Sequence, residues 1–219
     1  MSGILIFGAS GHGKVVRDIA HACGIQVIGF VDNQIPKGTQ ISGVPVLGAS
    51  GDLVQIVKES GCTSGIVAIG DNWVRARVVQ QTLDSSPNFS FVTLVHPQAV
   101  IASGVQIGMG SVVMAGSVVN PDCRIGAHCI VNSKSSIDHD GNIGDFASVA
   151  PGVTIGGSVH IGFFSAIGLG ANVIHKRNIG SHVVIGAGAL VLENIQDSVV
   201  AFGVPCSVIR TRTPGERYL

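Results

Sequence analysis

One histidine in the sequence lies between two acids, in the segment Ile137-Asp138-His139-Asp140. A carboxylate beside an imidazole holds the ring in one tautomer and stabilises the imidazolium form. His139 is therefore the first candidate for a residue that handles a proton. The other histidines lack an acid on either side, and we expect most of them to be solvated: positions 12, 21, 96, 128, 160, 175 and 182.

A glycine-rich turn near the N-terminus has the features of a phosphate site. The apolar run Ile4–Phe7 leads into Gly8-Ala-Ser-Gly11-His-Gly13-Lys and then into a stretch with helical period. Such a turn directs backbone N–H groups and a helix N-terminus at whatever lies above the strand. Asp32 ends the second expected strand, where an acid often meets a ribose or a base. Because the glycine spacing differs from that of dinucleotide enzymes, an NAD site and a purely structural turn both stay open.

Strands and helices alternate over residues 1–92, which is typical of a parallel sheet of Rossmann type. We expect helices within 14–23, 53–60 and 73–83, and strands at 4–7, 27–31, 44–47, 66–69 and 89–95. The last of these strands leads directly into a different pattern. We therefore predict a domain boundary near residue 93.

From Val95 to Val191 every sixth residue is Val or Ile, 17 times without a break. A period of six is neither that of a helix nor that of a hairpin, and it indicates a β-helix built from hexapeptides. Each β-branched residue points inward and stacks on its equivalent in the next coil. Since no coil can bury its own apolar side, the coils must stack. Residues 93–219 are thus predicted to form an all-β domain, with 203–219 as its cap.

Composition excludes several function classes. The formal net charge is zero and charged residues make up 12% of the chain, so we expect no nucleic-acid surface, which needs clustered Lys and Arg. No apolar run approaches the roughly 18 residues of a membrane span, and no basic segment precedes the first strand as in a signal peptide. The five cysteines show no metal-like pairing. We expect no membrane partner, no metal and a cytoplasmic location.

Together with the hexapeptides, four segments resemble bacterial sugar acetyltransferases of the hexapeptide-repeat family: GASGHG at 8–13, FVDN at 30–33, AIGDN at 68–72 and LVHPQA at 94–99. That family includes UDP-4-amino-sugar N-acetyltransferases and sialic acid O-acetyltransferase-like proteins, and the resemblance runs from end to end of the chain. It implies a left-handed parallel β-helix, a homotrimer, and acetyl-CoA bound between neighbouring subunits.

The resemblance also implies roles by position. His139 would be the general base, and Asp140 its partner where the amino-sugar enzymes usually carry Glu. Ser148, where some relatives have a second histidine, would donate a hydrogen bond to the thioester oxygen or only face the intersubunit cleft. The expected CoA-binding residues are Gly168, Leu169, Gly186 and Ala187. In the UDP-sugar site, Ser10, Gly11 and His12 would meet the phosphates or ribose, Asp32 and Asn33 the uracil, and Gly70 the edge of the nucleotide.

Three functions stay open. The first, which we favour, is acetyl transfer from acetyl-CoA to the 4-amino group of a UDP-linked amino-deoxy sugar. The second is O-acetylation of a sugar hydroxyl, which needs stronger activation than an amine. The third is a nucleotide-sugar-binding β-helix scaffold without turnover. His175-Lys176-Arg177, which we expect to interrupt the repeat, is either a loop near the CoA phosphates or a solvated turn.

Overall fold

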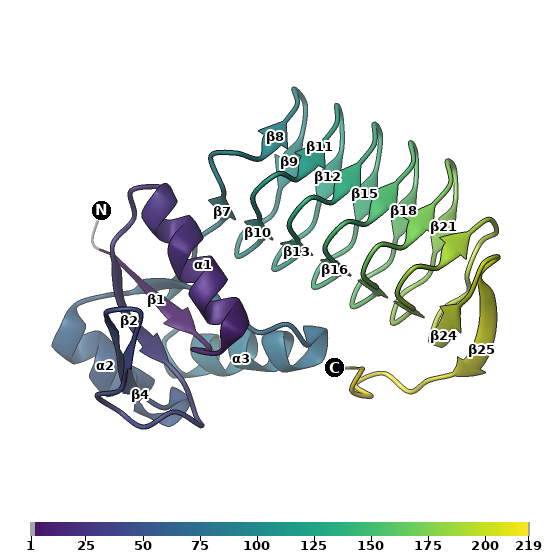
Figure 1. Cartoon of the computed structure of the whole chain (residues 1–219). Helices are drawn as coiled ribbons and strands as arrows, with labels where there is room; N and C mark the ends of the chain where they lie inside the picture. Colours follow the sequence, from purple (N-terminus) through teal and green to yellow (C-terminus); the bar gives the residue numbers. More distant parts are fainter. Residues whose placement is uncertain (1–2, 219) are drawn as a thin grey trace.

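The computed structural model describes residues 3–218; Met1, Ser2 and Leu219, which the expected domains 1–92 and 93–219 include, lie outside the described residues. An α/β layer at one end of the molecule leads into a prism of stacked coils (Figure 1). The expected fold class, a Rossmann-like α/β domain followed by a left-handed parallel β-helix, is confirmed. No helix among residues 3–218 has the length and apolar character needed to cross a membrane.

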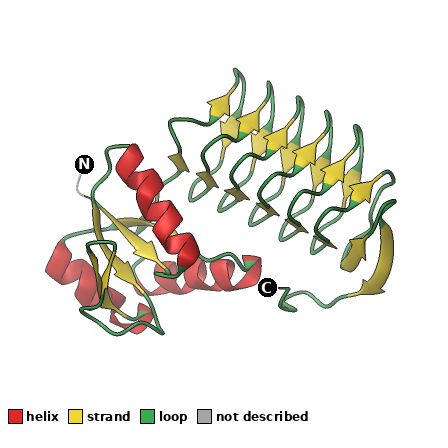
Figure 2. Ribbon diagram, in the orientation of Figure 1, coloured by secondary structure: helices red, strands yellow, loops and turns green. Residues whose placement is uncertain are grey.

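The first sheet has the strand order β3-β4-β2-β1-β5-β6. Its strands are β1 (Ile4–Phe7), β2 (Val27–Val31), β3 (Gln40–Ile41), β4 (Val44–Gly48), β5 (Ser64–Val67) and β6 (Ser90–Phe91). All neighbours pair in parallel except β3 and β4. β1 is fully buried: Ile4 and Ile6 pack with α1, whereas Leu5 and Phe7 pack with the residues of α2 and α3. Helices therefore cover both faces of the sheet (Figure 2).

The helices of this domain are α1 (Gly11–Ala22), the 3₁₀ turn η1 (Ser50–Asp52), α2 (Leu53–Ser60) and α3 (Asn72–Ser85). α3 begins after Asp71, whose carboxylate accepts hydrogen bonds from the backbone N–H groups of Trp73 and Val74 and so caps the helix. α2 ends at Gly61, which has a φ of 66°. A β-carbon is disfavoured at that φ, so Gly suits this helix end.

The β-helix has three faces, which the chain visits in turn. Face I contains β7 (Leu94–Val95), β10 (Val112–Val113), β13 (Ile130–Val131), β16 (Ser148–Val149), β19 (Ala166–Ile167), β22 (Val184–Ile185), β24 (Val199–Phe202) and β25 (Ser207–Thr211). Face II contains β8 (Val100–Ile101), β11 (Val118–Val119), β14 (Ser136–Ile137), β17 (Thr154–Ile155), β20 (Asn172–Val173) and β23 (Leu190–Val191). Face III contains β9 (Gln106–Ile107), β12 (Arg124–Ile125), β15 (Asn142–Ile143), β18 (His160–Ile161) and β21 (Asn178–Ile179).

Each coil takes three hexapeptides, because Val113 pairs with Val95 on one side and Val131 on the other. The Val and Ile that recur every sixth residue form one continuous core with the small or aliphatic residues that lie four positions after them. Glycine is required where coils nearly touch: a β-carbon on Gly144 would lie 2.7 Å from the backbone nitrogen of Phe163. The coils therefore stack closely enough for direct backbone hydrogen bonds between every pair.

An aromatic stack follows the corner between faces III and I. His128, Phe146, Phe164 and His182 are spaced by one coil, and successive ring centroids lie 4.9, 5.1 and 5.3 Å apart. Trp73 of α3 stacks on Phe164 at 4.5 Å. Stacked aromatic rings bury large apolar areas, so this stack joins the α/β domain to the β-helix.

Two details of the sequence prediction are wrong. The strand expected at 89–95 is two strands, since β6 pairs with β5 of the first sheet and β7 pairs with β10 of the β-helix. His175-Lys176-Arg177 does not interrupt the repeat, because β21 pairs in register with β18 directly after it. Lys176 takes a positive φ of 58°, close to the 57° of the equivalent Asp140 two coils earlier. The backbone thus tolerates Arg177, which lies four residues after Val173 at a position where most repeats carry a small or aliphatic residue.

Candidate active site

His139 and Asp140 lie at the corner between faces II and III, after β14. The imidazole Nδ1 is 2.8 Å from a carboxylate oxygen of Asp140, and more than half of each side chain is exposed. The hydrogen bond to Asp140 raises the pKa of His139. Asp138 fixes the turn, since its carboxylate accepts hydrogen bonds from the His139 backbone N–H and from Asn120 Nδ2.

The other ring nitrogen of His139 is free to act. Nδ1 is bonded to Asp140, so Nε2 is the nitrogen left to accept a proton in the neutral ring. The ring lies over the next coil, where a β-carbon on Gly157 would be 2.5 Å from Nε2. Glycine at this position therefore makes room for the imidazole. The arrangement suits a general base at an accessible corner.

A pocket of about 490 Å³ lies on face I, beside the N-terminal end of α1. Its walls include seven of the residues predicted from sequence: His12, Gly70, Ser148, Gly168, Leu169, Gly186 and Ala187. The residues expected to bind the nucleotide and those expected to bind CoA thus meet in one cavity. Tyr218, which no motif included, also lines it.

His12 gives this pocket a buried polar atom. Its Nε2 is buried and has no hydrogen-bond partner among the described residues. Burial, and secondarily the positive charge of Arg75, lowers the pKa of His12 to about 4. The imidazole is therefore neutral at pH 7. A buried polar atom without a partner is costly, and a ligand group would satisfy it.

Ser148 is engaged in a buried network between the two domains. Its hydroxyl donates to Asn72 Oδ1 at 2.5 Å and accepts from Arg75 Nη2 at 3.3 Å. In this geometry the hydroxyl proton of Ser148 is directed at Asn72 Oδ1, so donation to a thioester oxygen would require the hydroxyl to leave that bond.

Arg75 is the centre of that network and is 1% exposed. Its guanidinium donates to the carbonyls of Ile69 and Gly70 and, across the interface, to those of His128 and Phe146, over 2.8–3.0 Å. Burial lowers the pKa of Arg75. The five N–H groups of Arg match this fan of carbonyls, so Arg75 fixes α3 on the β-helix.

The remaining predicted nucleotide residues lie outside the pocket walls. Ser10 and Gly11 are exposed at the start of α1, and the Ser10 side chain makes no capping bond. Asp32 holds the glycine turn, since its carboxylate accepts from the backbone N–H groups of Ala9, Gln34 and Ile35. Asn33 Oδ1 accepts from the Ser50 backbone N–H at 2.8 Å. Asp32 and Asn33 therefore have a structural role whatever they bind.

The two glycines predicted to bind CoA are also explained by packing. A β-carbon on Gly168 would lie 2.6 Å from the Ile185 carbonyl oxygen, and one on Gly186 would lie 2.6 Å from Phe202 Cβ. Leu169 and Ala187, which follow them, are exposed. Glycine here serves coil stacking, and the exposed apolar side chains beside it give the pocket its rim.

Within one chain, the candidate catalytic pair does not lie at the pocket. His139 and Asp140 lie at the corner between faces II and III, which is the corner opposite face I in a three-sided prism. Neither residue lines the pocket on face I. The candidate base and the candidate binding pocket are therefore on opposite sides of the same β-helix.

Comparisons with known proteins give the family. Residues 3–82 match the PglD N-terminal domain. A histidine-to-alanine mutant of GDP-perosamine N-acetyltransferase from Caulobacter crescentus, solved with CoA and GDP-perosamine, is 36% identical over 96% of this chain and 98% of its own, with a TM-score of 0.90. The chain belongs to the hexapeptide-repeat sugar N-acetyltransferases.

Two further relatives of this sugar N-acetyltransferase support the same family assignment. The acetyltransferase domain of PglB from Neisseria gonorrhoeae FA1090, in complex with acetyl coenzyme A, is 32% identical over 95% of this chain and 99% of its own, with a TM-score of 0.85. UDP-N-acetylbacillosamine N-acetyltransferase of Bacillus subtilis (strain 168) is 32% identical over 115 residues, which is only 52% of each chain. The expected family, enzyme class and acetyl-CoA co-substrate are confirmed.

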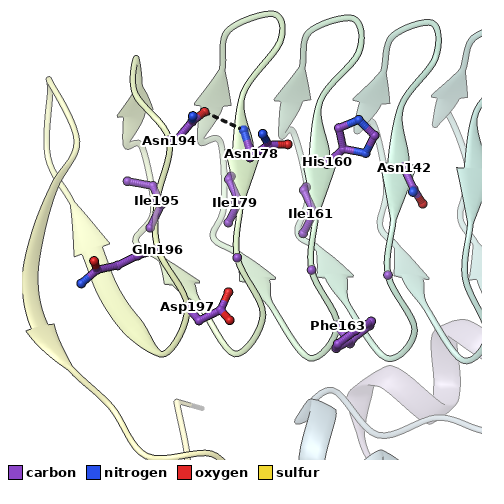
Figure 3. A pocket seen from close by; sticks show the side chains of 13 residues that line it. Asn142, His160, Ile161, Phe163, Asn178, Ile179, Asn194, Ile195, Gln196 and Asp197 are labelled. Carbon is purple, nitrogen blue, oxygen red and sulfur yellow. Dashed lines mark hydrogen bonds between the residues drawn. The ribbon is translucent and has the colours of Figure 1, made fainter.

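A second cavity in this sugar N-acetyltransferase holds none of the predicted residues. It is a groove of about 590 Å³ on face III, lined by Asn142, His160 and Asn178 among others (Figure 3). Asn194 closes one end, where its Oδ1 accepts from the Asn178 backbone N–H at 2.9 Å. Within residues 3–218, no group of three His, Cys, Asp or Glu is placed to hold a metal.

Sequence reasoning missed Asn72, Arg75 and Tyr218 in this sugar N-acetyltransferase. A signal for Arg75 existed: the buried face of α3 is Asn72, Arg75, Val78, Val79 and Thr82. A polar residue that shares a helical face with two valines at i+3 and i+4 is expected to be buried with partners. Tyr218 lies in a polar stretch without periodicity, and no local signal points to it.

Proposed function

We propose that this enzyme transfers acetyl from acetyl-CoA to the 4-amino group of a UDP-linked amino-deoxy sugar, with His139 as the general base. The observation that carries this proposal is the His139–Asp140 pair at 2.8 Å, with Nε2 free at an exposed corner. Membership of the sugar N-acetyltransferases supplies the reaction class.

His139 Nε2 accepts the proton of the amine as its nitrogen attacks the thioester carbonyl. Asp140 stabilises the imidazolium that forms. The tetrahedral intermediate collapses with cleavage of the carbon–sulfur bond, and the CoA thiolate leaves and takes up the proton. General-base assistance of this kind contributes about 10²–10⁴ in rate.

The binding residues are divided between the two substrates. Gly168, Leu169, Gly186 and Ala187 would hold acetyl-CoA along the corner between faces I and II. Ser10, Gly11, His12 and Gly70 would hold the diphosphate side of the acceptor at the N-terminus of α1, where N–H groups are free. Asp32 and Asn33 would meet the base. Ser148 would act as a wall of the pocket and as part of the interdomain network.

The separation of His139 from the pocket supports a shared site. In a C₃ trimer the corner between faces II and III of one copy can lie beside face I of the next, because every interface is the same. We therefore propose a homotrimer in which His139 of one copy serves the pocket of its neighbour. Sedimentation at micromolar concentration should give a trimer, and a stable, fully active monomer would contradict this assembly.

The nucleotide of the acceptor has two candidates, a uridine and a guanosine diphosphate. The Bacillus subtilis relative is named for a UDP-sugar, and the Caulobacter crescentus structures contain GDP-perosamine. A guanosine-linked acceptor is therefore the second candidate.

All five cysteines are free thiols in the described residues, as in a reducing compartment. This supports the proposal of a cytoplasmic location.

Thiol release from acetyl-CoA tests the function with UDP- and GDP-linked 4-amino sugars as acceptors. We expect release with a nucleotide-linked amino sugar, and binding of UDP or GDP alone by calorimetry. Asp32→Ala should weaken that binding and raise KM for the sugar nucleotide far more than for acetyl-CoA. Release with free sialic acid, but with none of the amino sugars, would instead support O-acetylation.

A further inference from the structure

One wall of the pocket on face I comes from a distant part of the chain. After β25 the chain turns back toward the α/β domain, and residues 212–218, which we call the tail segment, reach the start of α3 (Figure 1). Tyr218 in this segment lines the same pocket as His12 and Gly70. The tail segment thus joins the far end of the β-helix to the candidate nucleotide site.

The tail segment is fixed at its base. Arg212 is buried; its backbone N–H donates to the Ser198 carbonyl at 2.8 Å, and its Nη1 donates to the His182 carbonyl at 3.2 Å. The Arg212 guanidinium carbon lies 5.6 Å from the centre of the Tyr218 ring. A cation over an aromatic ring is attracted to it. Arg212 therefore orients the segment and the ring that ends it.

The Tyr218 hydroxyl is bound to the loop that leads into α3. It accepts from the Asn72 backbone N–H at 3.2 Å and donates to the Gly70 carbonyl at 3.3 Å. The Asn72 side chain in turn binds Ser148 and Arg75. One phenol thus satisfies two backbone groups of the loop 70–72, and that loop forms part of the pocket wall.

We propose that Tyr218 is a positioning residue for the nucleotide-linked acceptor. It holds the Gly70–Asn72 loop at the distance from His12 that the acceptor requires, and its ring closes the pocket on that side. This proposal rests on the proposed function. Its second support is His12 Nε2, a buried atom in the same pocket whose partner is missing among the described residues.

Tyr218→Phe is the decisive variant, because it keeps the ring and removes both hydrogen bonds. Loss of a pair of neutral hydrogen bonds should raise KM for the nucleotide-linked amino sugar about 5–10-fold. We expect kcat and KM for acetyl-CoA to stay within about twofold, since chemistry occurs at His139. Arg217→Ala, an exposed neighbour in the same segment, is the matched control and should leave every constant unchanged. A merely structural role for Tyr218 would lower Tm and change both KM values together.

A second measurement does not depend on turnover. Amide hydrogen exchange of the peptide that contains Ile69–Trp73 should be faster in Tyr218→Phe than in the wild type or Arg217→Ala, with no change elsewhere. Unchanged exchange, or an unchanged KM ratio in an active enzyme, would overturn the proposal while leaving the proposed function in place.

If the wild type acts on no nucleotide-linked amino sugar, the proposed function fails separately. The affinity for UDP and GDP, measured by calorimetry on the same three proteins, then tests Tyr218. Weaker binding by Tyr218→Phe together with faster exchange would support the positioning role, and equal binding would end it.

Discussion

The His139 corner and the buried cluster around Arg75 are both built from hydrogen-bonded polar groups, yet they differ in how they are made. His139 finds its partner in the next residue. Arg75 finds partners at His128 and Phe146, which are 53 and 71 positions away. The first is an exposed pair of neighbouring residues, and the second is a buried cluster that joins the two domains.

Titration separates the two regions in the same way. The carboxylate of Asp140 raises the pKa of His139 at its exposed corner. Burial lowers the pKa of His12 and of His128, each to about 4, with the charge of Arg75 as the second cause. The pKa of histidine is thus raised beside a carboxylate at the exposed corner and lowered where the ring is buried near Arg75.

Removing the base should give the largest effect. His139→Ala should lower turnover by at least about 10²-fold, because the amine loses its proton acceptor. The free energy of unfolding should change by less than about 0.5 kcal/mol, since the side chain is exposed. Steady-state kinetics and urea denaturation give the two numbers. His160→Ala, an exposed histidine on face III, is the control. Near-normal kcat in a folded His139→Ala protein would mean that the base lies elsewhere.

Arg75→Ala should show the opposite profile. It leaves the carbonyls of Ile69, His128 and Phe146 without this donor at the interface between the domains, so the free energy of unfolding should fall by about 2 kcal/mol or more. Urea denaturation measures this, with Arg77→Ala on the exposed side of α3 as the control, which should cost less than about 0.5 kcal/mol. A wild-type stability for Arg75→Ala would show that the interface between the domains does not depend on this network.

This contrast also explains what the sequence could reveal. The recurrence of Val or Ile at every sixth residue predicts the β-helix, because such a period is visible within a segment. The His139–Asp140 pair can be recognised in the sequence because the two residues are adjacent. The bond from Ser148 to Asn72 spans 76 positions, and no pattern within a segment reports such a pairing. Three hexapeptides per coil, which the family resemblance implies, align His128, Phe146, Phe164 and His182 and place His139 and Ser148 on different parts of the prism.

Asp140→Asn should have an intermediate effect that tests the corner alone. The carboxylate raises the pKa of His139, and the base works only when neutral, so kcat/KM should rise with pH through that pKa. Loss of the carboxylate lowers the pKa toward its ordinary value. The acid limb of the profile should therefore move to lower pH, while the plateau falls about tenfold through loss of imidazolium stabilisation. An unmoved acid limb would show that Asp140 does not tune His139.

The smallest expected effect is that of His128→Phe, which tests the buried cluster around Arg75. His128 stacks on Phe146 at 4.9 Å, and Phe146 and Phe164 occupy the same place in the next two coils with nearly the same φ. Phe should therefore fit at position 128. The other charged groups that act on His128 are Arg75, which lowers its pKa, and Asp145, which raises it. Burial is the largest cause, and together with these two charges it leaves the pKa of His128 lower in the folded chain than in the unfolded chain.

Because the pKa of His128 is lower in the folded chain than in the unfolded chain, low pH should destabilise the fold. Between the ordinary pKa of 6.5 and the folded value of about 4, the unfolded chain binds more protons than the folded chain, so stability falls as the pH falls through this window. His128→Phe removes that proton uptake. At pH 5 it should recover about 1 kcal/mol of unfolding free energy relative to the wild type, after allowance for partial exposure. At pH 7.5 the two proteins should have nearly equal free energies of unfolding.

Urea denaturation at both pH values, with His160→Phe as the exposed control, measures the difference. If the free energy of unfolding falls equally in the wild type and in His128→Phe between pH 7.5 and pH 5, protonation of His128 does not destabilise the fold. His128 would then not belong to the buried cluster around Arg75.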